Sequence, residues 1–291
     1  MKKLFVASLI CLLLAGCSAA PAVDAEDPAE KTASETASAS LPETEAPPVL
    51  SVPAVVTEGQ PWTEDGELPT VPRELRGWDQ EAEPVALLDW TEDAALYGLA
   101  GQEDRLLLQW GDTLAEFDWP YRTPHALNPE IWQVVYNDFV AQVVVCYYGT
   151  GTGVAVEQLH IVKKNQDGTL TDYCLPEGDL CGQQLTQALR LETVGGRTFA
   201  ILGRELLEIT DLIEDQAPPQ GLMAGSIVQF DVDPHDTYGV PIRFHGSAWL
   251  EGEDYPPTVW YAADISACVR FENGVFTLSD LHLDGIEELK E

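Results

Sequence analysis

The sequence predicts an all-β fold of antiparallel meanders and hairpins, propeller-like or sandwich-like in arrangement, with at most minor helix. The first observation is a set of two-residue turn signals between apolar segments, and the second is the shortness of those segments. Short apolar runs bounded by turn residues are typical of strands rather than helices. The runs cover residues 85–90, 95–99, 106–110, 114–119, 131–136, 140–148, 154–163 and 170–175.

The first four runs predict a four-stranded meander, and the other four predict a second group of strands. The run 140–148 is almost entirely apolar, so we expect a central strand that is covered on both faces. The best helix candidates are the short segments 181–189 and 205–212.

Three pairs of residues predict hairpin turns: Asn273-Gly274, Asp167-Gly168 and Gly195-Gly196. Asn-Gly suits a type I′ turn because both residues tolerate positive φ. In the order given, the turns predict the cross-strand pairs Phe271 with Phe276, Lys163 with Asp172, and Leu191 with Ala200.

Residues 1–16 are typical of a signal peptide. Two lysines precede an apolar run over residues 4–14, and a small-residue site follows immediately before Cys17. The run is shorter than the roughly 20 residues that a membrane-spanning helix needs. We therefore expect it to direct export and then to be removed.

The segment Leu14-Ala15-Gly16-Cys17 resembles the lipobox of bacterial lipoproteins. The resemblance implies that Cys17 becomes the mature N-terminus and carries a thioether-linked diacylglycerol. The protein would then be anchored to the extracytoplasmic face of the cell membrane, because two acyl chains hold a protein far more firmly than one. The alternative is an ordinary secretory signal followed by a chance cysteine.

Beyond the signal, the composition predicts two regions. Residues 17–61 are rich in Ala, Ser, Thr, Glu and Pro and contain few bulky apolar residues, so we expect a lipid anchor followed by a disordered acidic tether. All 8 Trp residues lie in 62–291, and this region is long enough to bury one substantial core. It is expected to be a single extracytoplasmic domain.

The chain is strongly acidic. It contains 15 Lys and Arg against 49 Asp and Glu, a formal net charge of -34. Such a charge repels the phosphate backbone of nucleic acids and anionic lipid surfaces. Nucleic acid is therefore excluded as a partner, whereas solubility at a crowded surface and cation binding both remain open.

The segment 147–163, which reads YYGTGTGVAVEQLHIVK, resembles a segment found in uncharacterised lipoproteins of Gram-positive bacteria. In that family a loop of calcium-binding type precedes the strand, and only Asp138 matches it here. The glycine-rich loop 149–153 lacks the spacing of a nucleotide-binding loop and is interpreted as a hairpin loop. The resemblance implies the lipoprotein class but no reaction.

The densest polar cluster contains Asp231, Asp233 and Asp236. Asp231 and Asp233 alternate along a strand and Asp236 follows at a turn, so their oxygens can converge on a cation. Hard oxygen ligands favour calcium, which is the only cofactor that the sequence suggests. The alternative is a solvated acidic turn.

Two of the cysteines predict a disulfide. Cys174 and Cys181 bracket a turn-rich loop, and an exported protein can form such a bridge. Cys146 and Cys268 lie within apolar strand patterns and are expected to pack as small apolar side chains.

Two function classes remain open. The first is a non-catalytic surface domain that binds a protein, a glycan or a cell-wall component. Its candidate ligand platform consists of the neighbouring aromatic residues Trp249, Tyr255, Trp260 and Tyr261. The second is a carbohydrate-active or other hydrolase that uses a pair of carboxylates. The candidates for that pair are Glu251, Glu253, Asp254 and Asp264.

Overall fold

The computed structural model describes residues 41–46, 48–63, 67–70, 85–99, 102–120, 129–136, 139–151, 154–213, 216–236, 240–252 and 261–286. All of these belong to one compact unit, Ala39–Glu291. The predicted residues that lie outside the described ranges are Cys17, Asp138, Glu253, Asp254, Tyr255 and Trp260.

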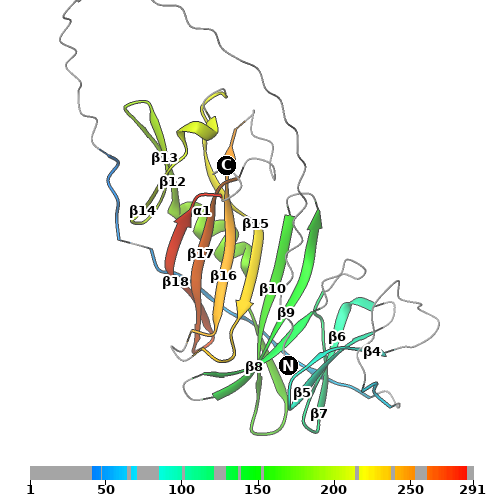
Figure 1. Cartoon of the computed structure of the whole chain (residues 1–291). Coiled ribbons are helices and arrows are strands. Elements are labelled where there is room, and N and C mark those ends of the chain that lie inside the picture. The colour runs from blue at the N-terminus through cyan, green and yellow to red at the C-terminus, as the bar shows by residue number, and fades with distance from the viewer. Residues whose placement is uncertain are drawn as a thin grey trace, which may run out of the picture. The chain divides into compact units, whose positions relative to one another are not determined.

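The described residues form an all-β structure with a ten-stranded, a five-stranded and a three-stranded sheet, which confirms the predicted fold class (Figure 1). Strand order in the largest sheet is β1-β18-β17-β16-β15-β10-β11-β2, with β9 beside β10 and β8 beside β9. Its pairs are antiparallel except for a short parallel contact between β10 and β15. The strands are β1 (Leu50–Pro53), β2 (Val55–Glu58), β8 (Glu130–Tyr136), β9 (Phe139–Gly151), β10 (Val154–Lys164), β11 (Leu170–Cys174), β15 (Gly221–Val232), β16 (Ile242–Glu251), β17 (Tyr261–Glu272) and β18 (Val275–Asp284).

The five-stranded sheet contains the predicted meander. Its order is β3-β7-β6-β5-β4. One face packs against the large sheet, where Leu106 and Leu108 join Val144 and Val162 in a shared apolar core. The strands are β3 (Gln60–Pro61), β4 (Val85–Trp90), β5 (Ala94–Leu99), β6 (Gln102–Trp110) and β7 (Thr113–Phe117).

The three-stranded sheet consists of β12 (Leu189–Val194), β13 (Arg197–Leu202) and β14 (Glu205–Glu208). The helical elements are the π-helix η1 (Gly178–Gln184), the helix α1 (Leu185–Ala188) and the 3-10 helix η2 (Thr210–Ile213). The predicted helix at 181–189 therefore exists. The helix predicted at 205–212 is wrong for its first half, because residues 205–208 form strand β14, which pairs with β13. No helix in the described part of the chain is long and apolar enough to cross a membrane.

The tether is shorter than its composition predicts. Residues 50–61 form the edge strands β1, β2 and β3, which pair with β18, β11 and β7 respectively. Leu50 and Val52 are buried while the residues that alternate with them are exposed. Two buried apolar side chains are enough to hold β1 in place, because the edge strand β18 supplies its backbone hydrogen bonds. The folded part therefore begins before Trp62.

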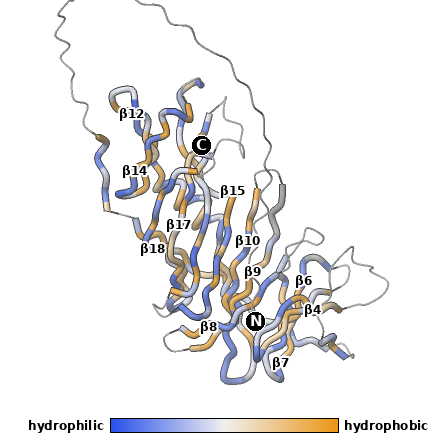
Figure 2. Tube along the Cα trace, in the orientation of Figure 1, coloured by the Kyte–Doolittle hydropathy of each residue, from blue (hydrophilic) through white to orange (hydrophobic). Residues whose placement is uncertain are grey.

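Burial along the strands follows their pleat. Residues 141–146 of β9 are all buried, as predicted for a central strand. In β15 and β17 buried residues alternate with more exposed ones, and Figure 2 shows hydrophobic and hydrophilic residues alternating along the large sheet. One face of β15–β18 therefore belongs to the core, and the other carries polar side chains.

Two of the three predicted turns have the predicted register. Asn273 and Gly274 adopt φ values of 52° and 78°, and Phe271 lies opposite Phe276. Leu191 lies opposite Ala200 across the Gly195-Gly196 turn.

The third hairpin differs from its prediction by one residue. The amide of Asn165 donates to the carbonyl of Thr169, so the loop is longer than the two residues of Asp167-Gly168. Asp172 consequently lies opposite Val162 and not opposite Lys163. A shift of one residue moves a side chain to the other face of the sheet, and Asp172 is therefore buried.

Replacing Gly274 by Val is expected to destabilise the domain by about 1–3 kcal/mol, because a β-branched residue is strained at positive φ. Thermal unfolding measures the loss. Gly178→Val is the control, since Gly178 has open space around its Cα and no positive φ. Equal melting temperatures for the wild type and Gly274→Val would contradict the turn assignment.

Candidate functional site

The outer face of β15–β18 brings polar side chains from four strands together. Along β16 the even-numbered side chains enter the core, whereas His245, Ser247 and Trp249 belong to the opposite face. Directly opposite residues in an antiparallel pair share a face. The register places Gln229 and Ser266 opposite His245.

A hollow of about 630 Å³ lies on this face. Its polar lining comes from β15, β16, β17 and β18, and the apolar residues Ile227 and Ile265 also line it. Carboxylates accept hydrogen bonds, while an amide, a hydroxyl and an imidazole can donate them. The lining therefore suits a ligand with many hydroxyl or amine groups. The polar residues are Gln229, His245, Asp264, Ser266 and Asp284.

His245 is held at the edge of the hollow by Asp231. Its Nε2 atom lies 3.0 Å from Asp231 Oδ2, but the contact does not meet hydrogen-bond geometry and is therefore an electrostatic one. Asp231 is largely exposed. The pair orients the imidazole beside the hollow, where Nε2 is buried while the side chain as a whole is 43% exposed.

Two of the four predicted platform residues also belong to this face. Trp249 on β16 lies directly opposite Tyr261 on β17, and both side chains are half-buried. After a bulge and the intervening pair Ala248 with Ala263, Ser247 lies opposite Asp264 on the same two strands. An aromatic pair thus lies beside the polar hollow.

In the acidic turn of the predicted calcium site, two aspartates accept hydrogen bonds from nearby backbone amides. Asp233 Oδ1 accepts the amide of His235 at 2.9 Å, and Asp236 Oδ2 accepts the amide of Val240 at 2.7 Å. Asp231 contacts His245 instead. The two turn aspartates thus satisfy their own backbone, and the described residues contain no group of three potential metal ligands.

The predicted carboxylate set is only partly described. Glu251 ends β16 and is exposed, opposite Gly221. Asp264 lies in the hollow and faces Asp284 of β18, a residue that sequence reasoning did not select. The described part of the site therefore pairs Asp264 with Asp284.

Glu157 is a half-buried carboxyl group where β10 and β15 separate. The two strands pair only at residues 155–156 with 227–228, and Glu157 Oε2 then accepts the amide of Phe230 at 2.7 Å. Burial raises the pKa of Glu157 to about 7, and the nearby Glu130 and Asp231 add to the increase, although the Phe230 amide opposes it. Glu157 thus links β10 to β15, and its carboxyl group gains or loses a proton near neutral pH.

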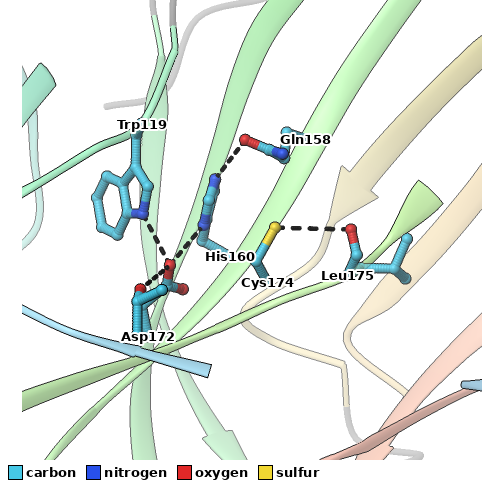
Figure 3. A network of polar contacts seen from close by, with 7 residues as sticks. Trp119, Gln158, His160, Asp172, Cys174 and Leu175 are labelled. Carbon is cyan, nitrogen blue, oxygen red and sulfur yellow. Dashed lines mark hydrogen bonds and ion pairs between the residues drawn. The ribbon is translucent and has the colours of Figure 1, made fainter. Parts of the chain in front are cut away.

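A second polar network centres on His160 and Asp172, which are buried between the two larger sheets (Figure 3). Asp172 Oδ2 accepts the indole N–H of Trp119 at 2.8 Å and lies 2.9 Å from His160 Nδ1. His160 Nε2 lies 3.1 Å from Gln158 Oε1. His160 and Asp172 are each 2% exposed by side chain.

The surroundings of the buried His160 imidazole favour its cationic form. Burial alone would lower the pKa of His160, but the Asp172 carboxylate beside it outweighs that effect and raises the pKa well above 6.5. A buried charge is tolerated only when it is paired and hydrogen-bonded. The enclosure of the network indicates a structural role.

The predicted disulfide does not form, since Cys174 and Cys181 are both free and buried. Cys174 ends β11 beside His160, and its thiol donates to the carbonyl of Leu175 at 3.6 Å. Cys181 lies in η1 and packs into the main core. The loop thus directs the two side chains into different surroundings. Cys146 is buried as predicted, and Cys268 is half-buried.

A smaller hollow of about 290 Å³ lies on the five-stranded sheet beside Trp90, which is 53% exposed. The Tyr97 hydroxyl donates to Gln109 Oε1 at 3.0 Å. These two polar groups are thus engaged with one another, while Thr91, Glu92 and Asp93 also line the hollow.

Sequence reasoning located part of the site and missed the rest. It selected Trp249, Tyr261, Asp231 and Asp264 but not Gln229, Ser266 and Asp284. The available signal was the alternation of polar and apolar residues along β15, β17 and β18. That signal identifies a polar face, but only the register shows which residues meet.

No family model matches the chain. No curated protein and no solved structure matches it either. The assignment of function therefore depends on the site itself.

Proposed function

We propose that the protein is a membrane-anchored, extracytoplasmic lipoprotein whose β domain binds a glycan at the outer face of β15–β18 without catalysing a reaction. The observation that supports binding is the hollow lined by Gln229, His245, Ser266 and two aspartates. Side chains of this kind bind the hydroxyl groups of a sugar, and an adjacent aromatic pair can stack on its rings.

A carbohydrate-active hydrolase is the second candidate, because Asp264 and Asp284 form a pair of carboxylates in the hollow. A general acid is normally kept protonated by apolar surroundings that exclude water. Both aspartates are exposed, which favours non-catalytic binding over hydrolysis. Cleavage of an oligosaccharide by the wild type and not by Asp264→Asn would reverse this preference.

The expected binding result uses a hexamer of β-1,4-linked N-acetylglucosamine as the probe. The wild-type domain should bind it in a calorimetric titration, and Trp249→Ala should weaken binding by roughly tenfold because a stacking surface is lost. Trp90→Ala is the matched control, since it removes an exposed tryptophan from the other sheet. If only Trp90→Ala lost binding, the glycan site would lie on the five-stranded sheet instead.

The anchor is proposed from the N-terminal sequence. The lipobox resemblance at Leu14-Ala15-Gly16-Cys17 supports lipidation of Cys17, and the Ala-, Ser- and Pro-rich segment after it supports a spacer between membrane and domain.

Replacing Cys17 by Ala should prevent lipidation, so that the protein no longer partitions into detergent with the membrane fraction. Ser18→Ala, which leaves the modified thiol in place, should partition as the wild type does. Unchanged processing and partitioning of Cys17→Ala would contradict the anchor.

A further inference from the structure

We infer that ionisation of Glu157 opens the contact between β10 and β15 and frees a segment of β15 that lines the hollow. This contact, called the seam below, consists of the paired residues 155–156 and 227–228 together with the Glu157 side chain. The change is sensitive to pH and belongs to the fold itself, whatever ligand the hollow binds.

Backbone pairing in the seam is limited to two residues of each strand, and it is parallel. Both strands are irregular here. The register of β15 with β16 shifts between Ala224 and Val228, and that of β10 with β9 shifts between Val156 and Glu157, which lies opposite Tyr147. Bulges interrupt the ladder of hydrogen bonds, and parallel pairs are slightly less stable than antiparallel ones. Little backbone pairing therefore opposes the separation of β15 from β10.

The Glu157 side chain extends the seam beyond its two backbone pairs. Its Oε2 atom accepts the amide of Phe230 at 2.7 Å, where a neighbouring strand would offer a carbonyl. Beyond this point β10 pairs with β11 instead, and the amide of Leu175 donates to the carbonyl of Leu159 at 2.9 Å. Glu157 thus holds β15 at the position where β10 changes its partner.

The charges around Glu157 make its ionised form unfavourable while the seam is closed. Glu130 of β8 and Asp231 of β15 are both acidic, and together with burial they raise the pKa of Glu157 to about 7. The basic groups Arg243 and His245 lie on β16, where they face Asp231. A carboxylate that swings into water escapes both burial and repulsion. A rising pH therefore favours the open seam.

The segment of β15 that the seam holds is also part of the wall of the hollow. Ile227 belongs to the seam and Gln229 directly precedes Phe230, and both of them line the hollow. Asp231, the next residue along β15, contacts His245 on the opposite side. Separation of β15 from β10 therefore moves two residues of the wall.

Amide hydrogen exchange, followed by NMR on the isotope-labelled protein, measures opening residue by residue. The amide of Phe230, which Glu157 holds, is compared with that of Leu175, which donates to Leu159. In the wild type, opening at Phe230 should cost less free energy than opening at Leu175, and it should not respond to low concentrations of urea because few residues become exposed. After correction for the intrinsic effect of pH on exchange, its opening constant should rise about tenfold between pH 6 and pH 8, since the pKa is about 7 in the closed seam and 4.5 in water.

The opening constant should be the same at both pH values in Glu157→Gln, which cannot ionise. Glu130→Gln should show a smaller rise than the wild type, because one repelling carboxylate is gone. Glu116→Gln is the matched control, since Glu116 is a half-buried glutamate on β7, and it should keep the tenfold rise. Equal free energies of opening at Phe230 and Leu175 would show that the seam opens only when the whole domain unfolds, and would overturn the inference. A rise that persists in Glu157→Gln would overturn it as well.

Discussion

Replacing Asp172 by Ala is expected to lower the free energy of unfolding by about 3–5 kcal/mol, because it leaves the buried His160 cation without its counter-charge. The indole N–H of Trp119 also loses its acceptor. Urea unfolding followed by circular dichroism measures the loss. Asp167→Ala is the control for an aspartate in the same hairpin, since Asp167 is exposed in the loop.

A double-mutant cycle separates the ion pair from simple loss of packing. His160→Leu combined with Asp172→Ala should be no less stable than Asp172→Ala alone, because the unpaired charge has been removed. Strictly additive losses would contradict a coupled pair.

The pair also predicts a dependence of stability on pH. The pKa of His160 is raised in the folded state. Its stabilising contribution is therefore fully present below the pKa of the unfolded chain and is lost as the pH rises through the higher folded value. The alkaline loss of stability should accordingly be smaller in His160→Leu.

Replacing Glu157 by Gln is expected to stabilise the domain above neutral pH by up to about 3 kcal/mol. The folded pKa of about 7 exceeds the ordinary value of 4.5, so the contribution of Glu157 is greatest below 4.5 and is lost as the pH rises to about 7. Gln cannot ionise, and its oxygen can still accept the Phe230 amide. The wild type and Glu157→Gln should therefore have similar stabilities in acid and diverge towards alkaline pH.

Glu157→Leu provides the control, because it removes the acceptor as well as the charge. It should be less stable than Glu157→Gln at every pH, since the Phe230 amide is left without its partner. A constant difference between the wild type and Glu157→Gln across the pH range would show that Glu157 has an ordinary pKa.

Local sequence signals predicted most of the strands because each signal acts within a few residues. The meander β4–β7 and the hairpin at Asn273-Gly274 depend on apolar runs and on positive φ, which can be recognised without tertiary information. The edge strands β1–β3 were missed because their hydrogen bonds come from distant strands. Residues 205–208 were misassigned for the same reason.

The buried network shows how one residue of register decides a site. A two-residue turn at Asp167-Gly168 places Asp172 beside Lys163, which would form an ordinary surface ion pair. The longer loop places it on the face that carries His160. Loop length depends on the hydrogen bonds of Asn165 and Thr169, and these are not evident from the dipeptide alone.

The candidate site was predictable only by its residue types. The aromatic and acidic residues of β16 and β17 were identifiable along the chain, whereas Gln229 and Asp284 join them only through the register of the neighbouring strands β15 and β18. In the acidic turn, sequence shows that the aspartates are close together but not which backbone amides donate to their carboxylates.

The most direct test of the proposed function is an NMR titration of the isotope-labelled domain with the N-acetylglucosamine hexamer. The largest shifts of backbone amide signals are expected at Gln229, His245 and Ser266, which surround the hollow. Signals near Trp90 should remain in place. Shifts centred on Trp90, or no shifts at saturating hexamer, would contradict glycan binding at β15–β18.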